Sequence, residues 1–127
     1  MKFGSFKPKK IPKPKAFKIE PKKNPFEAQA NKQKALTALA TGRRLTLTYL
    51  DCYRVVDVYT VGTSTADRPA MSVFQVDGQS NTPPIPDWRF FCFDECFDVA
   101  VSDITASPAQ PDFKKGAKQF KSIDAER

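Results

Sequence analysis

The chain has 127 residues, three cysteines, no histidine and a formal net charge of +7. This length predicts a single domain, and the lack of histidine excludes hydrolases that use histidine as the general base. Three cysteines without a repeated spacing predict neither a disulfide framework nor a zinc site. We therefore expect reduced thiols in a cytoplasmic protein that carries no metal or other cofactor. No stretch approaches the roughly 18 apolar residues of a membrane-spanning helix, so no membrane association is expected.

The positive charge is concentrated at the N-terminus. Residues 1–23 hold nine lysines and one glutamate, a net +8, whereas residues 24–127 carry a net −1. Closely spaced prolines and repulsion between lysines predict an extended, disordered arm over residues 1–24. Three roles stay open for it: a solubilising tail, a segment that docks on another protein, or a contact surface for nucleic acid. The lysines assigned to nucleic-acid contact are Lys7, Lys9, Lys10, Lys13, Lys15, Lys18, Lys22 and Lys23.

The residues that follow the arm predict one α-helix. Asn24 is a candidate N-cap with Pro25 at the first helical position and Glu27 at the third. The alanines and leucines that come next favour helix. Gly42 is expected to end the helix as a C-terminal cap.

After Gly42 the apolar residues alternate, which is typical of half-buried strands. The expected strands cover residues 44–50, 53–61, 71–77, 88–93 and 97–104. Five short strands at close spacing predict a mainly β domain over residues 25–105, either a small antiparallel barrel or a strongly bent sheet. The helix would cover one open end or face of it.

The strand expected at residues 88–93 has apolar side chains on both faces. One face should pack inside, and the other should meet the helix, the C-terminal residues or a partner chain. Residues 106–127 have a linker-like composition, and we expect a tail there or a short helix over about residues 117–125.

Two stretches together resemble the small WYL-type domain: RLTLTYLDCYRVVDVYTVGTS and VFQVDGQSNTPPIPDWRFFCFDE. The shared elements are a strand ending in tyrosine, an Arg-Val-Val segment leading to glycine, Phe-Gln-Val-x-Gly-x-Ser, and Trp-Arg-x-Phe before an acidic turn. The similarity covers about residues 33–104, with PDFKKGAKQFKSIDAER as a weakly similar tail. It implies a five-stranded Sm-like or SH3-like barrel. It also implies a stand-alone regulatory module of prokaryotic or phage origin that binds nucleic acid, a nucleotide-like anion or another charged ligand.

The resemblance places five residues in a ligand pocket: Tyr49, Arg54, Gln75, Ser80 and Arg89. Two guanidiniums at one rim could hold a phosphate or carboxylate bidentately, and the tyrosine offers a stacking plane.

A structural interpretation of the same residues stays open. Arg54 and Arg89 could instead form surface ion pairs, and Gln75 could hydrogen-bond the backbone of the long loop after its strand. The carboxylates available for such pairs are Asp57, Asp87, Asp94 and Glu95.

A second functional hypothesis is a protein-interaction or assembly component, in which a sheet edge and the arm bind a partner or a second copy of the chain. An enzyme is not expected. The carboxylate cluster at Asp94, Glu95 and Asp98 is interpreted as a solvated turn.

Overall fold

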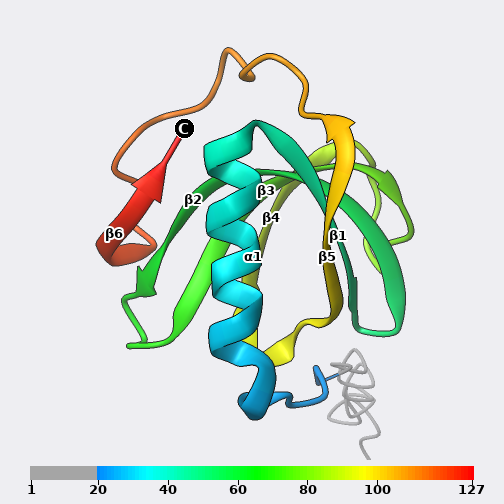
Figure 1. Ribbon diagram of the computed structural model, residues 1–127, viewed down its shortest axis with the longest axis vertical. Coiled ribbons are helices and arrows are strands. Elements are labelled where there is room, and N and C mark those ends of the chain that lie inside the picture. The colour runs from blue at the N-terminus through cyan, green and yellow to red at the C-terminus, as the bar shows by residue number, and fades with distance from the viewer. Residues whose placement is uncertain (1–19) are drawn as a thin grey trace, which may run out of the picture.

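The computed structural model describes residues 20–127, so most of the predicted arm lies outside the described residues. A single helix packs across one face of a bent, six-stranded antiparallel sheet (Figure 1). The elements are η1 (Pro25–Glu27), α1 (Ala28–Thr41), β1 (Arg43–Tyr49), β2 (Cys52–Ser64), β3 (Pro69–Gly78), β4 (Asp87–Cys92), η2 (Phe93–Glu95), β5 (Phe97–Thr105) and β6 (Phe120–Glu126).

The two ends of α1 differ in how well they were predicted. Gly42 ends the helix with φ of 65°, and its N–H donates to the carbonyls of Ala38 and Leu39, which confirms the C-terminal cap. Asn24 stands at the predicted N-cap position with Pro25 at the first helical position, but of the 3-10 turn η1 that precedes α1, and the expected capping bond is absent. Asn24 instead donates from Nδ2 to the carbonyl of Cys96 at 2.8 Å, which ties the start of the helix to the sheet. Within residues 20–127, no helix is long and apolar enough to cross a membrane.

The strands follow the order β4-β3-β2-β1-β5, with β6 paired to β2 outside that path. The mainly β prediction with one preceding helix is therefore confirmed, but the strands form an open sheet with six members rather than a closed five-stranded barrel. The two outer strands, β4 and β5, are separated in the chain by only η2 and Cys96. So short a link brings these edges close together at one end and requires the sheet to bend strongly.

The C-terminal residues form β6, not the short helix that was one expectation for them. β2 is long, and β1 pairs only with its first half, through Val56. β6 pairs with the second half, from Thr60 to Ser64. Unpaired backbone N–H and C=O groups on that part of β2 require partners, and a helix of two turns has little stability of its own. Gly62 permits the close approach, since a Cβ there would lie 2.2 Å from the carbonyl oxygen of Ser122.

The same C-terminal residues cover the outer face of β4. Phe91 joins the core beneath α1, whereas its neighbour Phe90 points to the opposite face and packs on Phe120, with ring centroids 5.4 Å apart. Trp88 packs beside Phe113 at 6.1 Å. Of the three coverings considered for this apolar face, the chain's own C-terminus is the one found.

Candidate functional site

Arg54, near the start of β2, is a buried cation with 2% of its surface exposed. Its Nε donates to the carbonyl oxygen of Tyr49 at 3.2 Å, and its Nη1 donates to Gln75 Oε1 at 3.1 Å and to Ser80 Oγ at 3.4 Å. The guanidinium also lies over the Tyr49 and Phe91 rings, 5.2 and 5.3 Å from their centroids. All these contacts are to neutral groups.

No ion pair within residues 20–127 includes Arg54. Asp57 is paired with Arg44 at 3.1 Å, and Arg68 pairs with the two acidic residues of η2. The interpretation of Arg54 as a surface ion-pair member was therefore wrong. Burial lowers the pKa of Arg54 from its ordinary value, and the positive charge of Arg89 acts in the same direction. A charge buried without a counter-charge is unfavourable, so this guanidinium favours an added anion.

Arg89, on β4, holds the long loop between β3 and β4. Its Nη2 donates to the carbonyl oxygens of Thr82 and Pro84 at 2.7 and 2.8 Å and to Ser80 Oγ at 3.3 Å. Nη1 lies 3.5 Å from Asp87 Oδ2, which confirms one of the expected ion pairs. The Nε atom is buried and has no hydrogen-bond partner.

Gln75 is fully buried on β3 and binds the same loop. Its Nε2 donates to the carbonyl oxygens of Asp77 and Gln79 at 3.1 and 2.9 Å, while Oε1 accepts the bond from Arg54. The interpretation that this amide satisfies the loop backbone is confirmed.

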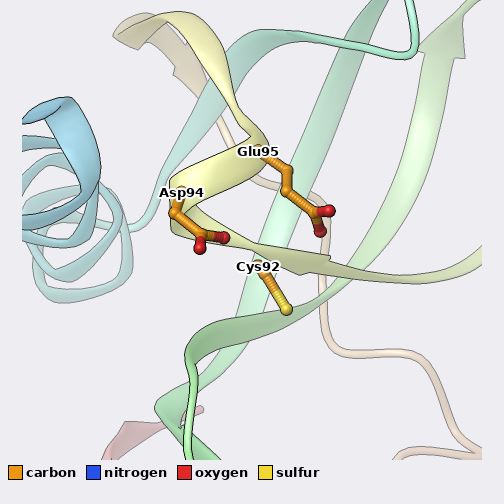
Figure 2. A group of neighbouring side chains, drawn as sticks. All are labelled: Cys92, Asp94 and Glu95. Carbon is orange, nitrogen blue, oxygen red and sulfur yellow. The ribbon is translucent and has the colours of Figure 1, made fainter. Parts of the chain in front are cut away.

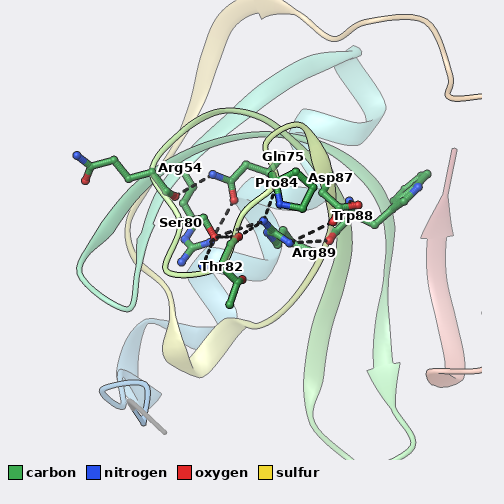
Figure 3. A network of polar contacts seen from close by, with 9 residues as sticks. Arg54, Gln75, Ser80, Thr82, Pro84, Asp87, Trp88 and Arg89 are labelled. Carbon is green, nitrogen blue, oxygen red and sulfur yellow. Dashed lines mark hydrogen bonds and ion pairs between the residues drawn. The ribbon is translucent and has the colours of Figure 1, made fainter. Parts of the chain in front are cut away.

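Ser80 joins the two arginines, as Figure 3 shows. Its hydroxyl accepts from both guanidiniums and donates to the carbonyl oxygen of Thr82 at 2.9 Å. All the residues assigned to the pocket therefore meet at one end of the sheet. We call them the arginine-pair site: Tyr49, Arg54, Gln75, Ser80 and Arg89.

Tyr49 contributes its ring face and its main-chain carbonyl to this site. Burial raises the pKa of Tyr49 to about 12, and the charge of Glu95 adds to the shift. The phenol is thus neutral near pH 7, and it does not supply the negative charge that Arg54 lacks.

Three contributors to the site were missed in the sequence. Two of them are the main-chain carbonyls of Thr82 and Pro84. The residue type does not show where a main-chain carbonyl points, because its direction depends on the path of the loop. Phe91 could have been found: it stands two residues after Arg89 on the same strand, and alternate residues share a face.

Two lysines assigned to nucleic-acid contact are described, and both form ion pairs within the chain. Lys22 Nζ lies 3.2 Å from Asp51 and Lys23 Nζ lies 2.8 Å from Glu95. They fix residues 20–24 to the domain, contrary to the prediction of a disordered arm up to residue 24. The other six assigned lysines lie outside the described residues.

Cys92, Asp94 and Glu95 place a thiol and two carboxylates within 4.8 Å of one another (Figure 2). Arg68 lies 2.5 Å from Asp94 and 3.3 Å from Glu95, and Lys23 also pairs with Glu95. Burial raises the pKa of the Cys92 thiol, which keeps it protonated and a poor metal ligand. Since two cations already balance the two carboxylates, the cluster is explained as an ion-pair network.

Comparison with known proteins adds no relative: no family model, no curated protein and no solved structure matches the chain. The resemblance to the WYL-type domain therefore rests on the quoted sequence motifs alone.

Proposed function

We propose that this protein is a non-enzymatic binding module for nucleic acid or a nucleotide-like anion. The arginine-pair site recognises a phosphate group, and the basic arm adds long-range attraction. The observation that carries the proposal is Arg54, a fully enclosed cation with neutral contacts only, beside a second guanidinium.

The geometry explains how an anion would be held. Both guanidiniums contact the single Ser80 hydroxyl, at 3.4 and 3.3 Å, so an oxygen at that position reaches both cations. Residues 81–86 are exposed, and outward movement of this loop would admit a ligand. A phosphate oxygen in place of the hydroxyl would turn neutral hydrogen bonds into charge-assisted ones, which are roughly twice as strong.

The finer fold assignment belongs to the same proposal. We infer that the sheet is a variant of the Sm-like or SH3-like barrel, with β6 added to the free part of β2. Two features support this: an N-terminal helix that packs on the sheet, and outer strands β4 and β5 linked by a single 3-10 turn. The module would then be a stand-alone prokaryotic or phage regulator that acts in the cytoplasm.

An assembly component remains the second candidate. β5 is an outer strand of the sheet, and Ile104 on it is 56% exposed. An outer strand with an exposed apolar side chain can pair with another chain. However, the apolar outer face of β4 that first suggested this role is covered by the chain's own C-terminal residues.

Fluorescence anisotropy with labelled single-stranded RNA, single-stranded DNA and duplex DNA tests the proposal on the full chain at low and moderate salt. We expect the affinity of the wild type to fall steeply as the salt concentration rises. Changing the six arm lysines from Lys7 to Lys18 to glutamine should make this dependence on salt shallower. Ser80→Asp should bind more weakly than the wild type at both salt concentrations. Ser80→Asn is the uncharged control for the serine site. Salt-independent binding, or unchanged binding in the Ser80→Asp variant, would contradict the proposal.

A further inference from the structure

A cavity of about 460 Å³ lies on the sheet face opposite α1, beneath the C-terminal segment. Trp88, Phe90 and Phe113 give it aromatic walls. Its volume falls in the range of small-molecule sites, which combine apolar walls with a few polar groups. Among the arginine-pair residues only Arg89 lines it, so it is a separate site.

Thr60 supplies the polar group. It is fully buried in β2, opposite Ser72 of β3, and both residues line the cavity. The Thr60 hydroxyl has no hydrogen-bond partner. Leaving a buried hydroxyl unpaired is unfavourable, so a ligand that accepts its hydrogen bond binds more tightly.

The charged residues around the cavity include one cation that is free for a ligand. Lys114 is positive and Asp112 is negative, whereas the Arg89 guanidinium is bonded to the loop between β3 and β4 and pairs with Asp87. The Asp112 carboxylate already accepts a hydrogen bond from Trp88 Nε1 at 2.9 Å, so it is held against the aromatic wall of the cavity. Lys114, which forms no ion pair within residues 20–127, is therefore the cation that an anionic ligand could reach.

We propose that this cavity binds a small planar aromatic molecule that carries one anionic group, of the class of the aromatic carboxylates. The ring packs against Trp88 and Phe113, as offset or edge-to-face contacts allow. The carboxylate accepts the hydrogen bond of Thr60 and is attracted by Lys114. The proposal is independent of the arginine-pair site, because neither Arg54 nor Ser80 takes part.

Trp88 is the only tryptophan in the chain, so its fluorescence reports directly on this cavity. Titration of the full chain with benzoate should give a saturable change in that fluorescence. Benzamide lacks the charge and cyclohexanecarboxylate lacks the planar ring, and each should bind about fivefold to tenfold more weakly, the equivalent of one modest interaction. Absence of a saturable response to benzoate, or equal affinity for all three compounds, overturns the proposal.

Thr60→Val separates ligand binding from folding. It should weaken benzoate binding by about fivefold to tenfold. It should not lower the unfolding temperature, because the hydroxyl it removes has no partner in the protein and valine keeps the shape. Lys114→Gln should weaken benzoate but not benzamide, and Lys115→Gln, an exposed neighbour outside the cavity lining, should change neither. Wild-type affinity in Thr60→Val, or a lowered unfolding temperature, counts against the assignment.

Discussion

Gly78→Ala is expected to lower the free energy of unfolding by about 3 kcal/mol or more, from two effects of about 1–3 kcal/mol each. Gly78 has φ of +93°, a conformation that alanine rarely adopts. A Cβ there would also lie 2.3 Å from the carbonyl oxygen of Tyr53, which accepts the hydrogen bond of the Gln79 N–H. The clash would push β2 away beside Arg54, so the arginine-pair site would loosen together with the fold.

Gly42→Ala is the matched control. Gly42 also has a positive φ, +65°, but no atom lies within 4 Å of its added Cβ. The control should therefore lose only the conformational part, about 1 kcal/mol. Urea unfolding of both variants measures the difference in their free energies of unfolding. Equal losses of stability would show that the clash of the added Cβ with the Tyr53 carbonyl does not destabilise the protein.

Gln75→Leu is expected to lower the free energy of unfolding by about 3 kcal/mol or more, because one change removes three hydrogen bonds from a buried site. The carbonyls of Asp77 and Gln79 lose the bond from Gln75 Nε2, and the buried guanidinium of Arg54 loses one of its three acceptors. Leucine is close to glutamine in volume although it branches one carbon nearer the backbone, so most of the loss reports on hydrogen bonding rather than on a cavity. The loop from residue 79 to 86 should also be cleaved faster by protease.

Gln79→Leu serves as the control for Gln75→Leu. The side chain of Gln79 is exposed, and its backbone carbonyl, the group that Gln75 binds, remains. Its effect on unfolding should stay within about 0.5 kcal/mol. If Gln75→Leu changed stability as little as this control, the buried amide would not hold the loop.

Much of the fold could be predicted because its signals are local. Gly42 ends the helix through its own backbone conformation, and the five strands before residue 105 follow from alternating side chains and from turn residues. The convergence of Arg54 and Arg89 was also predictable, since both stand on strands that flank β3. The burial of Gln75 could have been predicted as well, since it alternates with Met71 and Val73 on β3 and all three are buried.

The features that were missed depend on partners far away in the chain. β6 forms because β1 leaves half of one edge of β2 unpaired. The sequence of residues 120–126 alone does not show that this unpaired edge exists. The counter-charges are a second case. Arg44 and Arg68 take three of the four carboxylates that were considered for Arg54 and Arg89, and only Asp87 pairs with Arg89. Which cation reaches a carboxylate depends on the assembled sheet.

Calorimetric titration of adenosine 5′-monophosphate into the wild type, Ser80→Asn and Ser80→Asp tests the phosphate-binding role of the arginine-pair site most directly. An aspartate at this position would put a carboxylate between the two guanidiniums as a built-in counter-charge. The account predicts that the wild type binds and that Ser80→Asn binds within about tenfold of it, the loss of one hydrogen bond. Ser80→Asp should lose binding while its unfolding temperature rises. Wild-type affinity together with an unchanged unfolding temperature in Ser80→Asp, or no binding by the wild type, would contradict it.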